Sequence, residues 1–572
     1  MIDVEQVLTG RFPVLGRGAG TLLRRPLVGM LRRLFHEREV NRFLEAHRGV
    51  AGIEFVEQVL DYFDLSYRVS NRDRENIPVQ GRVVIIANHP LGALDALALI
   101  KLVSEVRRDV RIVANELLMQ LRPLHSLLLP VDNLGGATTR ADLRRIDQAL
   151  EAEQAVIIFP AGEVSRVRPS GIRDGRWSDG FLRIARRAEA PLLPVFIQAR
   201  NSSLFYAVSM FYKPLAALLL VQEMFRQRSN TIGFRVGNLI PLPRLKLDGL
   251  SRKEQLKLVR RHFFRVAKGK QGPLESETAI AHPVSRQGLR AELGRAERLG
   301  ATRDGKIIYL ADYRPDSELL EEIGRLRELT FRKVGEGTGR RRDLDRYDQH
   351  YRHLVLWDEQ ALEVVGAYRI GEVARIRAAE GLDGLYTASL FRLGPGFLPY
   401  TDHALELGRS FVQPAYWGSR ALDYLWQGLG AYLRSRPEVR YLFGPVSISQ
   451  HYPAEARDLI VGYYRRHYGG DPTLVTSRNP LTYSRQGREA CERLFDGHNA
   501  EEDFARLKDH LAEWGLTVPT LYKQYSELCE PGGTQFLDFG VDAEFGHCVD
   551  GFILVDLAKL RPKKRERYIG GA

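Results

Sequence analysis

The stretch VVIIANHPLGALD, residues 83–95, decides the fold of the first half of the chain. Its first five residues are uninterruptedly apolar, and a polar corner and a segment of small, helix-favouring residues follow. A short apolar run bounded by a turn is typical of a strand buried on both faces of a parallel sheet. Open α/β sheets gather their chemistry at the carboxyl ends of the strands. The pattern therefore predicts that His89 lies at that edge.

His89 and Asp95 form the candidate catalytic pair at this corner, with Asn88 beside them as a candidate substrate contact. Pro90 keeps His89 extended, because a residue that precedes proline avoids the helical region. Asp95 falls about one turn into the next helix, within reach of the imidazole. An aspartate beside a histidine fixes its tautomer and strengthens it as a general base. We expect His89 to take a proton from a hydroxyl that attacks an acyl group; a hydrogen-bonded pair without a catalytic role is the alternative.

Length and charge limit the kind of protein. A chain of 572 residues exceeds one hydrophobic core, so two or more domains are expected. The net charge of +13 favours an anionic partner: nucleic acid, an anionic membrane surface or an acidic carrier protein. Three cysteines without metal-ligand spacing suit a reducing compartment, and we expect no bound metal or cofactor. The first residues lack a signal-peptide pattern, and the apolar runs are too short to span a bilayer.

Strands and helices alternate after residue 80, which predicts a largely parallel sheet. The expected strands are 83–87, 110–114, 155–159 and 192–197, and the expected helices are 92–106, 138–151 and 178–188. After a polar linker the pattern restarts, with expected helices at 317–334 and 419–434 and strands at 362–371 and 388–393.

A second polar corner has the sequence FPAGEVSR, residues 159–166. Gly162 permits close approach of the backbone. Glu163, Ser165 and Arg166 are candidate contacts for the acceptor substrate, and the cation suits an anionic group. The alternative is an ordinary strand-to-helix loop.

Three segments in this order resemble the glycerolipid (lysophosphatidate) acyltransferase family: NHPLGALD at 88–95, FPAGE at 159–163 and LLPV at 192–195. The resemblance covers residues 60–240. It implies that His89 is the general base, and that the activated hydroxyl attacks an acyl thioester without a covalent acyl-enzyme.

Two departures from the family pattern bear on the acceptor. Five residues separate His89 from Asp95 where most members have four, and Ala161 stands where most have glutamate. The segment LPVDN, residues 129–133, lacks the basic residue that usually meets an acceptor phosphate. An acceptor without a glycerol phosphate is therefore indicated, and the five-residue spacing resembles the branch associated with ornithine-type aminolipids.

The second half carries another group of candidate residues, in LELGRSFV (405–412) and in YWGSRAL, which opens a predicted helix. A glycine near a helix start exposes N–H groups that can receive the phosphate of a pantetheine donor. Arg409 and Arg420 are candidates for further contacts with that phosphate. Glu406, near a strand end, is the candidate base for an attacking amine. A strand end with a solvated arginine is the alternative.

These segments resemble the acyl-carrier-dependent N-acyltransferases of ornithine-lipid synthesis, which have an acetyltransferase-like (GNAT) fold. The resemblance covers residues 290–560. It makes Asp542 a candidate for binding the ammonium group of the acceptor; an acid in a loop or at the core edge is the alternative.

Together the halves resemble the bifunctional ornithine-lipid synthases. The implied fold class is α/β: an N-terminal glycerolipid-acyltransferase-like domain with a mostly parallel sheet and a C-terminal GNAT-like α+β domain. The implied chemistry is N-acylation of an ornithine-like amino acid with a 3-hydroxyacyl chain, followed by O-acylation of that lyso-aminolipid. The predicted regions are a basic amphipathic membrane-contact region (1–60), an O-acyltransferase domain (61–270), a linker (271–288) and an N-acyltransferase domain (289–572).

The implied partners are acyl carrier protein, or coenzyme A as the alternative donor, and an anionic membrane, with the protein peripheral on the cytoplasmic face of the inner membrane. One rival is a lysophospholipid acyltransferase of the 1-acylglycerol-3-phosphate type whose C-terminal domain only docks carrier or membrane. Another is a basic binding protein, but no nucleic-acid-binding motif is present, so we expect no nucleic-acid partner.

Overall fold

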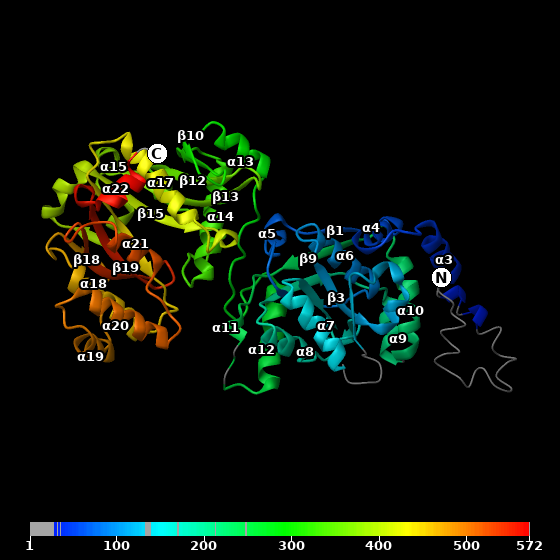
Figure 1. Ribbon diagram of the computed structural model, residues 1–572. Coiled ribbons are helices and arrows are strands. Elements are labelled where there is room, and N and C mark those ends of the chain that lie inside the picture. Colours follow the sequence, from blue (N-terminus) through cyan, green and yellow to red (C-terminus); the bar gives the residue numbers. More distant parts are fainter. Residues whose placement is uncertain are drawn as a thin grey trace. The chain divides into compact units, whose positions relative to one another are not determined.

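The computed structural model describes residues 28–30, 32–34, 36–131, 139–168, 171–211, 213–245, 247 and 249–570. The chain divides into two compact units, residues 1–279 and 280–572 (Figure 1). The division falls within the segment 271–288. Residues 1–27, 31 and 35 of the predicted membrane-contact region (1–60) lie outside the described residues. No helix in the described part of the chain combines the length and apolarity that crossing a membrane requires.

In its described part, the first unit holds a seven-stranded sheet in the order β1-β9-β8-β2-β5-β3-β4. Every neighbouring pair is parallel except β8 with β9, which confirms the predicted, mostly parallel sheet. The strands are β1 (Ser66–Arg68), β9 (Thr231–Val236), β8 (Leu192–Gln198), β2 (Val83–Ala87), β5 (Ala155–Ile158), β3 (Val110–Asn115) and β4 (Leu128–Val131). A separate hairpin joins β6 (Arg166–Arg168) and β7 (Gly171–Arg173).

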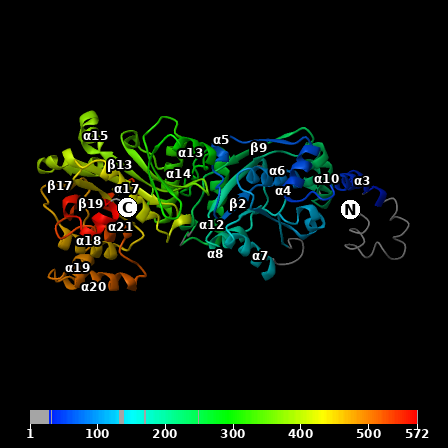
Figure 2. The same cartoon turned by 45° about the horizontal axis from the view of Figure 1, so that its top comes forward.

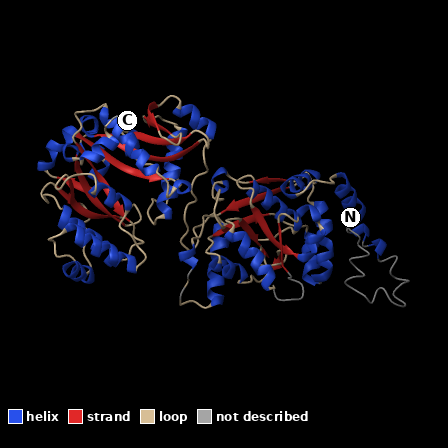
Figure 3. Cartoon of the chain, in the orientation of Figure 1, coloured by secondary structure: helices blue, strands red, loops and turns tan. Residues whose placement is uncertain are grey.

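Helices cover both faces of this sheet, as Figures 1 and 3 show. All five residues of β2 are buried, and alternate side chains belong to two different core clusters, as expected for a central strand. Helices α4 and α6 contribute to one cluster, and α7, α8 and α12 to the other. The helices are α3 (Glu37–Ala46), α4 (Gly52–Tyr62), α5 (Asn71–Arg74), α6 (Ala93–Ser104), α7 (Arg140–Glu151), α8 (Gly180–Arg187), α9 (Ser203–Phe211), α10 (Lys213–Arg226), α11 (Leu242–Leu245) and α12 (Arg252–Val266).

The second unit is built on an eight-stranded sheet, again within the described residues, in the order β10-β11-β12-β13-β15-β16-β19-β18. All neighbours are antiparallel except β15 and β16, which run parallel. The strands are β10 (Glu297–Ala301), β11 (Ile307–Ala311), β12 (Arg352–Asp358), β13 (Glu363–Glu372), β15 (Ala404–Val412), β16 (Tyr441–Ile448), β19 (Cys548–Asp556) and β18 (Thr534–Asp542). Two short strands, β14 (Phe391–Leu393) and β17 (Val475–Ser477), pair separately.

The helices of this unit complete an α+β domain. They are α13 (Arg286–Leu293), α14 (Glu318–Lys333), α15 (Val373–Glu380), α16 (Tyr386–Leu390), α17 (Ala421–Arg434), α18 (Ala454–Tyr468), α19 (Arg485–Leu494), α20 (Ala500–Glu513), α21 (Thr520–Ser526) and α22 (Pro562–Tyr568). Helices α18, α19 and α20 pack together beyond the sheet (Figure 2).

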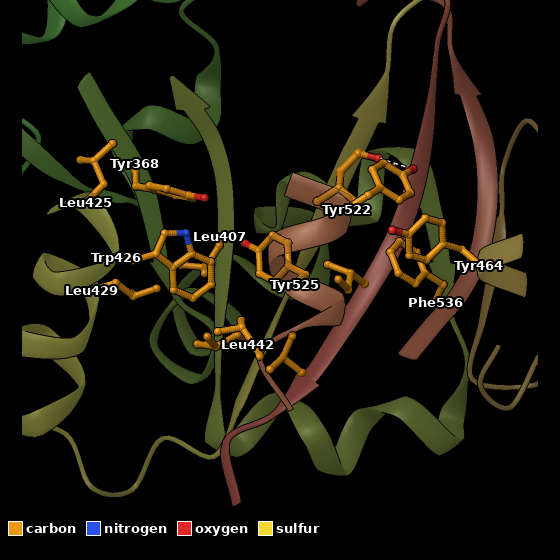
Figure 4. Packing of buried hydrophobic residues seen from close by; sticks show 14 of the residues in the cluster. Tyr368, Leu407, Leu425, Trp426, Leu429, Leu442, Tyr464, Tyr522, Tyr525 and Phe536 are labelled. Atoms are coloured by element: carbon orange, nitrogen blue, oxygen red, sulfur yellow. Dashed lines mark hydrogen bonds between the residues drawn. The ribbon is translucent and has the colours of Figure 1, made fainter. Parts of the chain in front are cut away.

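Aromatic side chains fill much of the main core of the second unit (Figure 4). Trp426 on α17 meets Tyr525 on α21 with ring centroids 5.2 Å apart. Tyr522 stacks on Phe536 of β18 at 5.2 Å, and its hydroxyl donates to the Val446 carbonyl of β16. These contacts fix α17 and α21 against the strands that border the cavity described below.

One predicted strand, 388–393, is wrong in its first half. Residues up to Leu390 belong to helix α16, and only Phe391–Leu393 form a strand. The reason is tertiary: the backbone N–H of Thr387 donates to the buried Glu406 carboxylate, a contact that the local sequence does not reveal.

Candidate active sites

The strand-end corner of the first unit is fixed by Asn88. Its side-chain Nδ2 donates to the Ile197 carbonyl (2.9 Å), and its Oδ1 accepts from the Ile197 N–H (2.7 Å). The amide therefore ties the end of β2 to β8, and both of its polar atoms are engaged. These bonds give Asn88 a positioning role, and its contact with substrate stays a prediction.

His89 and Asp95 lie together as predicted from the sequence. The His89 Nδ1 is 3.0 Å from Oδ1 of Asp95, which is fully buried. The other carboxylate oxygen of Asp95 accepts from the Leu91 N–H (2.8 Å), which holds the carboxylate in place. The imidazole stacks on Phe159 with centroids 4.1 Å apart. Because Nδ1 faces the carboxylate, Nε2 is the nitrogen left to meet a substrate.

The electrostatics of this site favour protonation of the imidazole. Burial alone lowers the pKa of His89, but the charge and hydrogen bonding of Asp95 and the charge of Asp174 outweigh it and raise that pKa above its ordinary value. A histidine whose basicity is raised by buried carboxylates is suited to accept a proton.

Asp174 is a member of this site that the sequence reasoning missed. It is buried and accepts from the Ser165 hydroxyl (2.5 Å) and from the Trp177 indole N–H (3.1 Å). The backbone N–H of Ser165 donates to the His89 carbonyl (2.8 Å). Ser165 therefore links two loops, and its contact with substrate stays a prediction. No motif in the local sequence marks Asp174, because its link to His89, 85 residues earlier in the chain, is a tertiary contact.

The remaining residues of the second corner divide between the cavity and its surroundings. Gly162 lines the cavity with φ of +62°, a left-handed conformation that favours glycine. Glu163 lies 3.5 Å from Nε of Arg166 and packs against Gly175. Within the described residues, Nε and Nη1 of Arg166 are buried without a hydrogen-bond partner. Neither Glu163 nor Arg166 lines the cavity.

A cavity of about 1110 Å³ adjoins His89. Most of its lining is apolar and comes from both core clusters of the first unit. Its lining includes Phe43, Val59, Ile100, Leu128, Phe181 and Met224. A large, mostly apolar cavity with His89 in its wall is suited to a long hydrocarbon substrate.

The second unit has a cavity of about 650 Å³ where β15 and β16 separate. The two strands pair at only three positions, from Ala404 with Tyr441 to Glu406 with Phe443, and beyond that point both line the cavity. Ser410 and Phe411 lie on one side and Pro445 and Ser447 on the other. The divergence leaves room for a substrate between two strands of one sheet.

Arg409 lies in the wall of this cavity, as the sequence analysis anticipated for a substrate contact. It has φ of +51° at an irregularity in the β13–β15 ladder. Its guanidinium lies 3.1 Å from Asp343 and stacks on the rings of Tyr386 and Phe545. Burial lowers its pKa, but Asp343 and the other acids nearby raise it overall, so the cation is retained.

Glu406 occupies a different place from the one expected of a catalytic base. Its carboxylate is fully buried and accepts from the Tyr351 hydroxyl and from the backbone N–H and hydroxyl of Thr387. It is absent from the cavity lining. Three donors saturate this carboxylate, so we reinterpret Glu406 as an anchor for the start of α16.

Asp542 and Arg420 also lie outside the cavity lining. Asp542 is buried, accepts from the Tyr386 hydroxyl (3.3 Å) and caps the N–H of Glu544 (2.9 Å). Arg420 is 57% exposed at the start of α17 and pairs with Asp423 (3.2 Å). Asp542 therefore contacts the cavity wall only indirectly, by accepting a hydrogen bond from Tyr386, which lines the cavity. Arg420 lies on the surface.

Two carboxylates that the sequence reasoning did not select do line the cavity: Glu336 and Asp550. Burial raises the pKa of Glu336 to about 7, against the opposing effects of Ser447 and Arg409. Burial and the neighbouring carboxylates of Asp542 and Glu336 raise the pKa of Asp550 well above its usual range. The one local signal for Glu336 is its position in the sequence Gly-Glu-Gly, at a turn.

Both halves of the chain are similar to known acyltransferases. The acyltransferase family matches residues 6–270, and the acetyltransferase (GNAT) domain matches residues 326–427. The chain is similar to a glycine N(alpha)-acyltransferase of Phocaeicola vulgatus, with 33% identity over 51% of this chain and 92% of the relative. It is similar to a lyso-glycine lipid O-acyltransferase of Bacteroides thetaiotaomicron, with 30% identity over 42% of this chain and 89% of the relative. An L-ornithine N(alpha)-acyltransferase of Rhodobacter capsulatus is 28% identical over 44% and 92%.

Fold, cavities and family matches define a two-domain acyltransferase, with an acyltransferase domain first and a GNAT domain second. The chain belongs to the family of aminolipid acyltransferases that includes these N-acyl and O-acyl relatives, as an ornithine-lipid-synthase-like fusion.

Proposed function

We propose that this protein makes a diacylated amino-acid lipid in two steps. The second unit transfers a 3-hydroxyacyl chain to the α-amine of an ornithine-like amino acid, or of glycine. The first unit then acylates the 3-hydroxyl of that lyso-lipid. The observation that carries the proposal is the presence, in one chain, of similarity to an N-acyltransferase and to a lyso-lipid O-acyltransferase of the same lipid class.

In the O-acylation step, Nε2 of His89 takes the proton of the lyso-lipid hydroxyl as the oxygen attacks the thioester carbonyl. Asp95 holds Nδ1 protonated and stabilises the imidazolium that forms. The carbon–sulfur bond then breaks, and the imidazolium returns the proton to the leaving thiolate. The apolar cavity beside His89 suits the acyl chains of donor and acceptor.

In the N-acylation step, the space between β15 and β16 receives the acyl thioester. Val334 and Trp417 line this cavity and are 39% and 48% exposed, so an apolar rim is available to the acyl chain. Arg409 provides a retained cation in the cavity wall for the carboxylate of the amino acid or for the donor.

The proposal includes an acyl thioester as co-substrate, carried by acyl carrier protein or coenzyme A, and no further cofactor. The net charge of +13 suits an acidic carrier protein and an anionic membrane surface. We place the protein peripherally at the cytoplasmic face of the inner membrane, where both lipid products belong.

The test is lipid mass spectrometry of a bacterial host that lacks aminolipids and expresses the full chain. The expected result is an N-acyl amino acid and its O-acylated product, with the amino acid identified by fragmentation. Growth with labelled glycine and labelled ornithine separates the two amino acids. A host that gains only diacyl glycerolipid, with no N-acyl amino acid, would overturn the proposal in favour of a single lysophospholipid acyltransferase.

A further inference from the structure

Glu336 lies in the cavity of the second unit on a turn held firmly in place. Gly335 and Gly337, with φ of +78° and +111°, bracket it, and its own N–H donates to the Phe331 carbonyl at the end of α14 (2.8 Å). The buried Glu328 accepts from the N–H groups of Thr338 (3.1 Å) and Gly339 (2.9 Å). A residue on a turn anchored at both ends has a defined position in the cavity wall.

Groups from three strands and the following loop surround the Glu336 carboxylate. The Ser447 hydroxyl of β16 and the Arg409 guanidinium of β15 both favour its ionised form. The charge of Glu336 in turn raises the pKa of three groups: Asp550 and Cys548 of β19, and Tyr452. Ser447 and Asp550 are direct cross-strand partners in the β16–β19 ladder. The ring of His451 packs against Gly335.

We propose that Glu336 is the catalytic base of N-acylation. This inference rests on the proposed function and assigns the proton acceptor that Glu406 does not provide. Two observations favour Glu336 over the other acids. It lines the cavity between the diverging strands, and among the described residues its ionised form is favoured by the Ser447 hydroxyl and the Arg409 guanidinium. Glu406 is saturated by three donors, and Asp542 is occupied by Tyr386 and a backbone N–H.

Asp550 shares the cavity with Glu336, but the two carboxylates cannot both ionise easily in a desolvated site. Asp550 is the more deeply buried, and burial together with the neighbouring carboxylates raises its pKa well above the usual range, which favours its protonated form. Glu336, next to Arg409 and Ser447, ionises near neutral pH. A base with a pKa of about 7 is matched to proton transfer at physiological pH.

The neutral amine nitrogen bonds to the thioester carbonyl carbon, and one of its protons passes to the Glu336 carboxylate. The carbon–sulfur bond breaks with its electron pair on sulfur, and the Glu336 carboxylic acid delivers the proton to that thiolate. The products are an amide and a free thiol, and Glu336 is a carboxylate again.

The experiment uses the full-length protein and its Glu336→Gln and Glu336→Asp variants, with Glu544→Gln as the control because that glutamate is exposed and lies outside the cavity lining. The probes are 3-hydroxymyristoyl thioesters of coenzyme A and of acyl carrier protein, with glycine and ornithine in separate assays. We expect kcat of Glu336→Gln to fall roughly 10²–10⁴-fold with little change in KM for the thioester, and Glu336→Asp to retain part of the rate.

The pH profile separates catalysis from a structural role. In the wild type, kcat/KM should rise through an apparent pKa of about 7, and Glu336→Gln should lose that limb and keep only the limb of the amine itself. Because the ionised Glu336 is disfavoured in the folded protein, Glu336→Gln should keep or raise Tm at pH 8.

Three outcomes would contradict the proposals, and each has a different meaning. A wild-type protein that acylates neither amino acid overturns the proposed function. A wild type that acylates an amino acid, with Glu336→Gln retaining its rate and its limb near pH 7, overturns the assignment of Glu336 alone. A Glu336→Gln protein whose Tm falls at pH 8 together with its activity would assign the residue a structural role instead.

Discussion

The His89–Asp95 pair is the residue-scale feature on which the proposed O-acylation depends. His89→Ala removes the proposed base, so O-acylation should fall roughly 10²–10⁴-fold while N-acylation continues. The lyso-lipid should then accumulate, which mass spectrometry of total lipid measures. Arg183→Ala is a useful control, because Arg183 lines the same cavity and is 67% exposed. Wild-type levels of diacylated product from His89→Ala would remove His89 from the mechanism.

The raised pKa of His89 sets a pH dependence. A general base works in its neutral form, so the O-acylation rate should rise as pH increases through the pKa of His89, above the ordinary value of 6.5. The charged His89–Asp95 pair stabilises the folded protein at low pH. This stabilisation is fully present below the pKa of His89 in the unfolded chain and is lost as pH rises through its higher pKa in the folded protein.

The Asp95→Asn variant tests whether Asp95 is the cause of the raised pKa of His89. Removing the largest raising effect leaves burial dominant, so the limb of the O-acylation profile should move to lower pH and the maximal rate should fall. The measurement is kcat/KM against pH with a purified lyso-lipid. An unmoved limb would mean that Asp95 does not control the imidazole.

For individual residues, the sequence predicted that His89 and Asp95 lie together, but it did not predict the partners of Asn88, Ser165 and Glu406. The first pair is six residues apart on one corner, so its contact follows from local structure. The partners of the other three lie 109, 9 and 55 residues away, and sequence reasoning could not see that these partners saturate them. Glu336 was missed for the same reason, because only tertiary structure places its turn in the cavity.

Among the elements, strands with continuous apolar runs were predicted within a residue or two, such as β2 and β8. Three strands of the first unit's main sheet, β1, β4 and β9, were not predicted; they are short or carry exposed residues, so their sequence period is weak. The cavity of the second unit could not be predicted at all. It follows from the parallel neighbours β15 and β16, and the order of strands in a sheet is a tertiary property.

Gly444 controls how these two strands approach each other. It lies just past the last β15–β16 pair, and a Cβ there would be 2.0 Å from the Leu407 carbonyl oxygen. Gly444→Ala must therefore push β15 and β16 apart at the start of the cavity. We expect a lower Tm of the second unit and loss of N-acylation, with O-acylation of added lyso-lipid retained.

Gly300→Ala provides the matched control for that change, because a Cβ at Gly300 meets nothing within 4 Å. Calorimetry and both acyl-transfer assays should leave it close to wild type. Equal losses in Gly444→Ala and Gly300→Ala would show that the close approach at Gly444 is unimportant.

For the whole molecule, each compact unit contains its own cavity and its own titratable group, His89 in the first and Glu336 in the second. In the proposed two-step synthesis, the product of the second unit is the acceptor of the first. If release into the membrane precedes the second step, two differently inactivated proteins should together complete the synthesis. Coexpression of His89→Ala with Glu336→Gln should thus restore diacylated lipid in a host where either variant alone makes little.

The amount of diacyl product measures how complete this complementation is. The diacyl product of the coexpressed pair should approach that of wild type expressed at half the level, since each reaction then has half its normal number of competent units. Coexpression of His89→Ala with Asp95→Asn is the matched control, because both changes impair the same unit and should not complement. Restoration in the mixed pair but not in the control would establish a freely exchanging intermediate, whereas no restoration, with both proteins folded, would show that the lyso-lipid passes only within one chain.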